Sequence, residues 1–337
     1  MDAAAALDEI AFLLERELAE PFKIKAFRTA SVTISGLAAG ELAARAADGR
    51  LAKTKGIGGR GLEVIRQALD GEVPAYLQNL RDQPAASVSA AGRTLLTKLR
   101  GDLHTHSDWS DGTVSIEKMI TAARSLGREY VAVTDHSPNL RVAHGLTAER
   151  LRDQLKLVER LDADSDGIRV LSGIEVDILE TGDLDQQPEL LELLDVVVAS
   201  VHSKLRADTA TMTERMLAGI RHPATNILGH CTGRLVRGAR GTRPASDFDA
   251  KRVFAECASR NVAIEINSRP ERQDPPTAVI GLAIEAGCLF SIDTDAHAPG
   301  HLDFLGGGAE RAASAGVPPD RIITTWPVDR LLDWTRG

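Results

Sequence analysis

The stretch that decides the fold reads Asp102-Leu103-His104-Thr105-His106-Ser107-Asp108-Trp109-Ser110-Asp111. It begins as a short strand, and Asp111 is followed by Gly112, a pair that ends the strand in a turn. Two histidines one residue apart on a strand point to the same face. Their imidazoles therefore lie side by side, as a metal centre needs. A polar strand end is the alternative, and the rest of the chain decides between the two.

From residue 101 onward the chain repeats a pattern of strand, loop and helix. Strands are expected at 101–105, 130–134, 169–176, 195–201, 226–229, 262–267 and 289–293, with an eighth candidate at 321–326. Amphipathic helices are expected at 114–127, 147–162, 208–221, 248–260 and 276–287. Short apolar strands alternating with helices indicate parallel pairing with the helices outside. Seven or eight such units favour a barrel, an α/β fold.

The ends of these expected strands carry side chains of the kinds that bind metal ions. Six of the nine histidines lie there, and scattered core histidines would not sort in this way. The strand-end segments are His104-Thr105-His106 with Asp111, Thr134-Asp135-His136-Ser137, Gly173-Ile174-Glu175-Val176-Asp177, Ser200-Val201-His202-Ser203, Gly229-His230-Cys231-Thr232-Gly233-Arg234, Glu265-Ile266-Asn267-Ser268-Arg269 and Asp293-Thr294-Asp295-Ala296-His297. So many nitrogen and carboxylate groups exceed the four ligands of one tetrahedral zinc. They suit two or three ions of zinc, manganese or iron.

The composition limits the class of protein. A chain of 337 residues has room for about two domains with a sizeable core. The net charge of -8 argues against coating by nucleic acid over the whole surface, but it is compatible with a local basic site. Three cysteines outside any CxxC spacing favour a reducing cytosol. With no basic leader and no apolar run of membrane-spanning length, we expect a cytoplasmic protein without membrane contact.

Residues 1–83 are expected to form a separate all-helical domain. The segment Lys53-Thr54-Lys55-Gly56-Ile57-Gly58-Gly59-Arg60 opens an amphipathic helix there. Free backbone N–H groups at the positive end of a helix dipole can hold a phosphate. The alternative is an inert helical pack whose glycines merely permit a tight turn. Residues 84–93 are small and weakly patterned, and we expect a linker there, followed by the barrel domain at 94–337.

The segment at residues 53–60, with the helix that follows it, resembles a helix-hairpin-helix. Together with Glu20-Pro21-Phe22-Lys23-Ile24-Lys25-Ala26-Phe27-Arg28, it resembles the N-terminal domain of bacterial family-X DNA polymerases. The resemblance implies non-specific binding of duplex DNA or its ends, with contacts from Lys53, Lys55, Gly56, Gly58 and Arg60. Some relatives carry a lysine that forms a Schiff base, in the helix after the hairpin. That position is Val64 here, which argues against a lyase activity. The chain also leaves no space for a polymerase palm, so polymerase activity is rejected.

The strand-end segments resemble, in the same order, those of the polymerase-and-histidinol-phosphatase (PHP) superfamily over about residues 101–330. The resemblance implies a distorted (β/α)7 TIM-like barrel that holds three divalent metal ions. It implies a first ion on His104, His106, Glu175 and Asp295. Glu175 would bridge to a second ion, which His202 and His230 complete, and the third would lie on Asp111, His136 and His297. No ligand position is lost, which favours an active site over a degenerate one.

The chemistry expected at such a centre is hydrolysis of a phosphate ester by a metal-bridging hydroxide. Arg234 and Arg269 are candidate clamps for phosphoryl oxygens, and a surface ion pair is the alternative for each. His144, in the loop after the second strand, is either a substrate contact or leaving-group acid, or a solvated loop histidine. Asp135 beside His136 either orients that ligand or caps a turn.

Two substrate classes remain open for this enzyme. One is a nucleic-acid 3′ end, processed by a 3′–5′ exonuclease or a 3′-phosphatase. It is favoured by the hairpin and by a basic loop that holds Arg234, Arg237, Arg240 and Arg243. The other is a small phosphomonoester of the histidinol-phosphatase type, which needs no hairpin domain. A non-catalytic DNA-end-binding module is a third hypothesis, and the complete ligand set argues against it. The expected partner is thus a phosphate-ester substrate, and DNA is favoured over a small molecule. The sequence indicates no protein partner.

Overall fold

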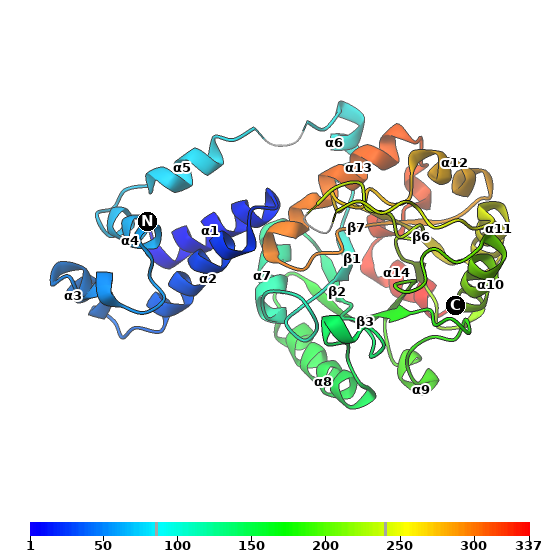
Figure 1. The fold of residues 1–337 in the computed structure, drawn as a ribbon, viewed down its shortest axis with the longest axis horizontal. Coiled ribbons are helices and arrows are strands. Elements are labelled where there is room, and N and C mark those ends of the chain that lie inside the picture. Colours follow the sequence, from blue (N-terminus) through cyan, green and yellow to red (C-terminus); the bar gives the residue numbers. More distant parts are fainter. Residues whose placement is uncertain (85–86, 239–240) are drawn as a thin grey trace. The chain divides into compact units, whose positions relative to one another are not determined.

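The computed structural model describes residues 1–84, 87–238 and 241–337 (Figure 1). The chain divides into two compact units, Met1–Ala86 and Ser87–Gly337. A linker was expected at 84–93, but residues 90–93 form the first part of helix α6 (Ala90–Leu96). Ser89 caps that helix by accepting a hydrogen bond from the Gly92 backbone N–H at 3.1 Å. The second unit therefore starts earlier than its expected boundary at residue 94.

The first unit is all helical in its described residues. Its elements are α1 (Ala3–Arg16), α2 (Pro21–Ser35), α3 (Glu41–Ala47), the 3₁₀ turn η1 (Arg50–Lys53), α4 (Gly59–Leu69) and α5 (Ala75–Arg81). Asp2 caps α1 through the Ala5 backbone N–H, and Pro21 occupies the first turn of α2, where its missing N–H is harmless. Apolar faces of these helices pack into one core, which includes Leu7, Ile65 and Leu77.

The second unit is built on a parallel sheet whose strands follow one another in chain order. The seven strands among its described residues are β1 (Gly101–Thr105), β2 (Tyr130–Val133), β3 (Arg169–Asp177), β4 (Val196–Ser200), β5 (Ile227–Leu228), β6 (Ala263–Asn267) and β7 (Phe290–Asp293). The ends of the sheet meet next to β1 and β7, where the His106 backbone N–H donates to the Ala296 carbonyl at 2.7 Å. A parallel bridge joins Thr105 to Ala296 beside it. The expected distorted seven-stranded α/β barrel is thus confirmed.

Helices surround this barrel (Figure 1). They are α7 (Ile116–Ser125), α8 (Ala148–Asp164), α9 (Pro188–Leu191), α10 (Thr209–Arg221), α11 (Ala250–Ser259), α12 (Thr277–Glu285), α13 (Leu305–Ser314) and α14 (Val328–Thr335), with 3₁₀ turns η2 (Arg141–Ala143) and η3 (Pro299–Phe304). The strands are buried on both faces because helices cover the outside and apolar side chains fill the inside. No helix among the described residues is long and apolar enough to cross a membrane.

The prediction of an eighth strand at 321–326 was wrong. This segment forms two 3₁₀ turns, η4 (Pro319–Arg321) and η5 (Ile323–Thr325), and only Ile322 makes an isolated bridge, to Phe290. Prolines precede the segment and follow it, and a proline cannot donate to a strand ladder. The apolar side chains that suggested a strand, including Ile323 and Trp326, instead pack with α14 in the core inside the barrel.

Candidate metal centre

The histidines of the first strand end lie together as their spacing predicts. His104 is on β1 and His106 follows it, and their ring centroids are 5.1 Å apart. The ring of His106 also lies 4.4 Å from that of His136 and 4.2 Å from that of His297. Because the carboxyl ends of parallel strands meet at one end of a barrel, side chains from β1, β2 and β7 share one site.

Glu175, on β3, lies at the centre of this group, and its side chain is 1% exposed. Imidazole nitrogens from the ends of β1, β2, β4 and β5 surround its carboxylate. The distances to its nearer oxygen are 3.2 Å for His104 Nε2, 3.5 Å for His106 Nε2, 2.9 Å for His136 Nδ1, 3.2 Å for His202 Nε2 and 2.8 Å for His230 Nε2. One carboxylate thus faces five histidines that come from the ends of four strands.

A second group of possible ligands lies around Asp111. Its carboxylate is 3.5 Å from His136 Nε2 and 3.3 Å from His297 Nε2. Asp295 Oδ1 lies 3.5 Å from His106 Nε2 and 3.5 Å from His297 Nδ1. Three sets of side chains bring their ligand atoms close enough to hold an ion: His106, Asp111, His136 and His297; His104, His106 and Glu175; and His136, Glu175 and His202.

The polar atoms of the site fit divalent cations. Several are buried and make no hydrogen bond to any described residue: both ring nitrogens of His106 and of His202, His104 Nε2, His136 Nδ1, His230 Nδ1 and Glu175 Oε2. Buried polar atoms in folded proteins nearly always have partners, because leaving them unpaired is costly. Ring nitrogens and carboxylate oxygens are also the donors that zinc, manganese and iron accept. These residues could therefore hold two or three such ions.

The charges of the site keep its carboxylates ionised, which is the form that binds metal. Burial raises the pKa of Glu175, but the neighbouring His104, His202 and His136 outweigh it and hold that pKa well below its usual value. In the same way, Arg272 and His106 hold the pKa of Asp295 well below the usual value against the effect of burial. Burial, together with the charges of His297 and His136, lowers the pKa of His106, which favours a neutral imidazole.

Three side chains without a predicted role support the centre. Glu265, on β6, lies 2.6 Å from His104 Nδ1 through Oε1, and its Oε2 accepts from the His230 backbone N–H at 2.5 Å. Arg272 Nε donates to Asp295 Oδ2 at 2.9 Å. Asp177 accepts from the His202 backbone N–H at 3.1 Å. The sequence signal for Glu265 and Asp177 was a charged residue in a strand-end segment, which does not say which ligand it contacts, and Arg272 lies beyond those segments.

The two candidate arginine clamps have different surroundings. Arg269 is 8% exposed, and its Nη1 lies 3.0 Å from His297 Nδ1. It lines a cavity of about 310 Å³ together with Asp111, Arg237 and His297. The guanidinium of Arg234 instead donates to backbone carbonyls of the loop after β6, those of Arg272, at 3.1 Å, and Gln273. Only Arg269 of this pair therefore faces the candidate ligands.

The other residues of the basic loop are partly held by backbone carbonyls. Arg237 Nε donates to the Pro270 carbonyl at 3.2 Å, and Arg243 Nε donates to the Gly233 carbonyl at 2.7 Å. Arg240 lies outside the described residues. His144 is exposed after η2, and within the described chain no hydrogen bond or ring contact joins its imidazole to the centre. Of the described loop arginines, Arg237 lines the cavity, whereas Arg234, Arg243 and His144 do not.

Asp135 does not orient His136, which corrects one of its two expected roles. Its carboxylate accepts from the Ser107 backbone N–H at 2.8 Å, from the Ser107 hydroxyl at 2.6 Å and from Gln154 Nε2 at 2.6 Å. The Ser110 hydroxyl donates to the same carboxylate. Asp135 therefore braces the loop between His106 and Asp111, and acts on the centre through that loop.

The hairpin of the first unit has the geometry of a tight turn before a helix. Gly56 has a φ of +93°, and a Cβ there would lie 2.7 Å from Thr33 Oγ1, so a side chain is excluded. Gly58 precedes α4 without a side-chain cap, and Lys53, Lys55 and Arg60 are exposed around it. Arg60 pairs with Glu63 at 3.1 Å. Val64 is fully buried in the core of the unit, so a lysine nucleophile has no counterpart there.

Comparisons with known proteins place this geometry in a family. Residues 102–269 match the PHP domain. DNA polymerase/3'-5' exonuclease PolX of Bacillus subtilis is 38% identical over 228 residues, which are 68% of this chain. The chain spans only 39% of the length of that relative. Probable phosphatase YcdX of Escherichia coli is 28% identical over 244 residues, which cover 69% of this chain and 92% of that protein.

Among solved structures, the histidinol phosphate phosphatase of Lactococcus lactis, in complex with zinc, L-histidinol and phosphate, is 22% identical and superposes with a TM-score of 0.48. The match covers 65% of this chain and 94% of that structure. The family assignment rests on the match to residues 102–269, which include six of the seven barrel strands and most of the candidate ligands. This chain belongs to the PHP domain family.

Proposed function

We propose that the protein is a metal-dependent phosphoesterase that acts on nucleic-acid 3′ ends, as a 3′–5′ exonuclease or a 3′-phosphatase. The observation that carries the phosphoesterase part is the convergence of five histidines on the buried carboxylate of Glu175. In this proposal the first ion is held by His104, His106, Glu175 and Asp295. The second is held by Glu175, His202 and His230, and the third by Asp111, His136 and His297.

When bound, divalent ions supply positive charge to phosphoryl oxygens and lower the pKa of water. The chain supplies the rest of the site. Arg269, fixed beside His297, offers a planar guanidinium that can hold two phosphoryl oxygens as negative charge develops on them. Glu265 and Arg272 keep His104 and Asp295 in the orientation that binding requires. The cavity beside Arg269 gives the phosphoryl group a place next to the candidate ligands.

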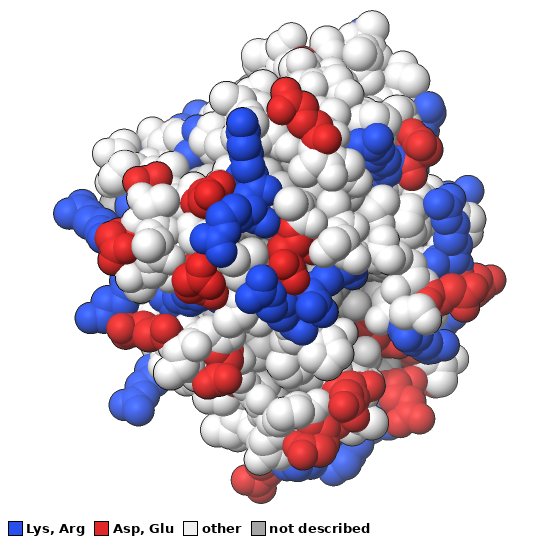
Figure 2. Space-filling model, turned by 90° about the vertical axis from the view of Figure 1, so that its right-hand side faces the viewer, with Lys and Arg blue, Asp and Glu red and all other residues white. Residues whose placement is uncertain are grey.

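The nucleic-acid part of the proposal rests on the first unit and on the basic loop. Gly56 and the uncapped start of α4 present backbone N–H groups of the kind that contact phosphates. Basic and acidic side chains alternate over the barrel face in Figure 2, so attraction for a polyanion must come from local groups of cations. Arg237 at the cavity entrance is one such cation. The Bacillus subtilis relative has an exonuclease activity in its name.

A small-molecule phosphomonoesterase is the second candidate function. It is favoured by the Escherichia coli relative, which is named a phosphatase and is matched over 92% of its length by 69% of this chain. A non-catalytic DNA-end-binding module is less favoured, because all nine proposed ligand positions are retained. We also propose a cytosolic location, since Cys231, Cys257 and Cys288 are buried and unbridged, as in reducing compartments.

Metal analysis combined with three substrates tests the proposal. The metal content of the purified protein is measured first, followed by turnover of a labelled DNA 3′ end, a bis-aryl phosphodiester and histidinol phosphate. We expect bound divalent metal, hydrolysis of the DNA and of the diester, and loss of both activities after chelation. Turnover of histidinol phosphate alone would favour the second candidate. Metal-loaded protein that binds DNA and hydrolyses none of the three would support the binding module.

A further inference from the structure

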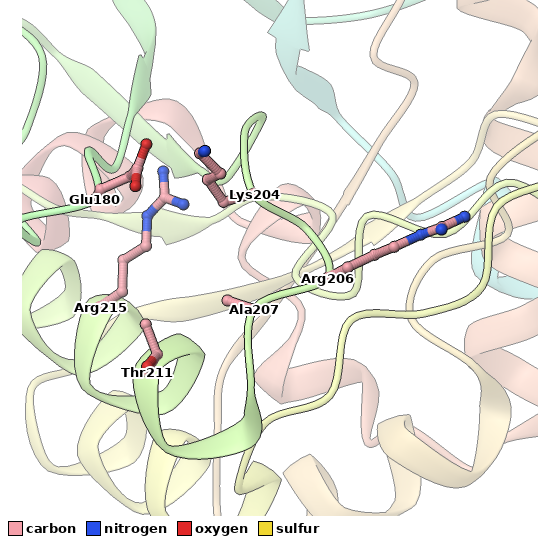
Figure 3. Close-up of a pocket in the computed structure, with 6 residues that line it drawn as sticks. All are labelled: Glu180, Lys204, Arg206, Ala207, Thr211 and Arg215. Carbon is pink, nitrogen blue, oxygen red and sulfur yellow. The ribbon is translucent and has the colours of Figure 1, made fainter.

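A hollow of about 330 Å³ lies near the ends of β3 and β4, and none of the proposed metal ligands lines it. It is lined by Glu180 after β3, by Lys204, Arg206 and Ala207 after β4, and by Thr211 and Arg215 of α10. Figure 3 shows the Arg215 side chain reaching up from α10 to between Glu180 and Lys204, whereas Arg206 extends away from this group. The hollow is therefore at the carboxyl ends of β3 and β4, the same end of the barrel as the metal centre.

Two contacts connect the wall of the hollow to the centre. Arg215 Nη2 lies 4.0 Å from Asp177 Oδ1, and that oxygen lies 3.5 Å from His202 Nδ1. The other nitrogen of the same ring, His202 Nε2, is 3.2 Å from Glu175. Asp177 thus links the wall of the hollow to His202, a proposed metal ligand.

Basic side chains outnumber acidic ones in the lining of the hollow. Arg215 is buried and donates to uncharged acceptors, namely the Ile178 carbonyl at 2.8 Å, the Ser203 carbonyl at 2.8 Å and the Ser203 hydroxyl at 3.2 Å. Lys204 is exposed, and no hydrogen bond or ion pair joins its side chain to another residue in the described part of the chain. Glu180 is the one carboxylate among the six lining residues. Arg206, Lys204 and Arg215 still exceed Glu180 and the nearby Asp177 by one charge, which favours an anionic ligand.

The backbone of Lys204 also has an uncommon conformation. Its φ of +52° is in the left-handed region, which a lysine seldom adopts. The flanking chain holds it there, since Arg215 binds the Ser203 carbonyl on one side and the Ala207 backbone N–H donates to the Lys204 carbonyl at 2.9 Å on the other. The backbone of Lys204 is therefore held in place two residues after His202.

We propose that this hollow is a subsite for a second, non-scissile phosphate of the nucleic-acid strand whose terminal ester is hydrolysed at the centre. Lys204 contacts that phosphate, and the buried guanidinium of Arg215 supplies fixed positive charge behind it. This inference rests on the proposed function for its class of substrate. It adds a binding position on the His202 side of the centre, whereas the cavity beside Arg269 is on the Asp111 and His297 side. A small phosphomonoester has no second phosphate to place there.

The test compares two oligonucleotides without terminal phosphates, a dinucleotide with one phosphate and a trinucleotide with two. For the metal-loaded wild type, kcat/KM for the trinucleotide should exceed that for the dinucleotide by about tenfold. In Lys204→Gln this ratio should fall close to one, and in Lys204→Glu it should fall at least as far, because the new charge repels phosphate. Lys156→Gln is the matched control, since Lys156 is exposed on α8 and pairs with Asp153 there. Its ratio should equal that of the wild type.

A binding measurement separates this subsite from the proposed function. A trinucleotide whose terminal linkage is a phosphorothioate is titrated against wild type and Lys204→Gln in parallel. DNA turnover with equal ratios and equal affinities in both proteins would overturn the subsite and leave the function standing. No DNA turnover, but weaker trinucleotide binding in Lys204→Gln, would overturn the exonuclease form of the proposed function and support the subsite. Neither turnover nor binding of the trinucleotide by the wild type would overturn both the exonuclease and the subsite.

Discussion

Glu175 lies among five histidines, whose imidazole nitrogens are within 3.5 Å of its carboxylate. The ionised form is favoured there despite full burial, since the neighbouring histidines lower its pKa well below the usual value. A residue with these surroundings is suited to lie between two cations.

Replacing Glu175 with Gln should keep the shape of the side chain and remove its charge. We expect lower metal content and a loss of turnover of at least about a hundredfold, because a neutral amide would hold two divalent ions much more weakly than a carboxylate. The far-ultraviolet circular dichroism spectrum should match that of the wild type. Full metal content with nearly unchanged hydrolysis would contradict the bridging assignment.

Glu265 contacts two proposed metal ligands and is not itself one of them. Its carboxylate lies between His104 Nδ1 and the His230 backbone N–H, so it orients one ligand and fixes the backbone of another. In Glu265→Gln an amide replaces one of these two acceptors. We expect the affinity for metal to fall by about ten- to a hundredfold, measured by competition with a chelator. Glu285→Gln, at the end of α12, serves as the control. An unchanged affinity in Glu265→Gln would show that His104 is oriented without it.

At the scale of elements, the loop after β5 combines structural and exposed arginines. Arg234 and Arg243 bind backbone carbonyls, whereas Arg237 lines the cavity that also contains Arg269. The loop therefore has an anchored part and a part directed at the route into the site.

Changing Arg237, Arg240 and Arg243 together to Ala should lower activity on DNA relative to a bis-aryl phosphodiester. We expect the ratio to fall by roughly ten- to a thousandfold, at about one kcal/mol or more for each lost phosphate contact. An equal fall on both substrates would indicate that the loop had lost its conformation, which Arg243 helps to hold. No fall on DNA would favour a small-molecule substrate.

Helices α10 and α11 are joined at the surface by Glu256, which accepts from Arg221 at 3.1 Å and from Arg260 at 2.7 Å. These two arginines lower the pKa of Glu256 from 4.5 to about 2. A carboxyl group whose pKa is depressed by folding stabilises the protein above its unfolded pKa. That contribution is lost as the pH falls from about 4.5 through about 2.

Glu256→Gln should therefore lower the free energy of unfolding by about 1 kcal/mol at neutral pH, a value limited by solvent screening. The difference from the wild type should shrink progressively below about pH 4.5, in denaturant titrations at several pH values. Glu214→Gln, which removes an exposed pair with Arg252, is the control and should show a smaller difference. A constant difference down to pH 2 would contradict the pKa shift of Glu256.

For the whole molecule, the division at Ala86 and Ser87 allows the two units to be tested separately. A fragment that starts at Ser87 keeps all nine proposed ligands and helix α6. We expect it to hydrolyse a small aryl phosphate like the full chain, and to bind DNA more weakly with a flatter dependence on salt. The affinity is measured at several salt concentrations. An unchanged affinity and slope would assign the first unit to the inert packing alternative.

The alternation of apolar strands and amphipathic helices was sufficient to predict the barrel, and the histidines at strand ends were sufficient to predict where the candidate ligands gather. Both patterns are local, because a strand or helix imposes its period on neighbouring residues. The same period failed at 321–326, where flanking prolines and packing against α14 turned a strand-like segment into 3₁₀ turns.

The particular contacts of the centre were decided only by the tertiary structure. His104 and Glu265 are 161 residues apart, so no local pattern indicates their 2.6 Å contact. The same holds for Arg234, whose guanidinium binds the loop after β6, and for Arg215, which brings positive charge from α10 to Lys204. Sequence alone determined which residue types arrive at one end of the barrel. Which of them touch depends on how distant strands and loops pack, because a side chain's direction is set by neighbours that only the folded chain brings together.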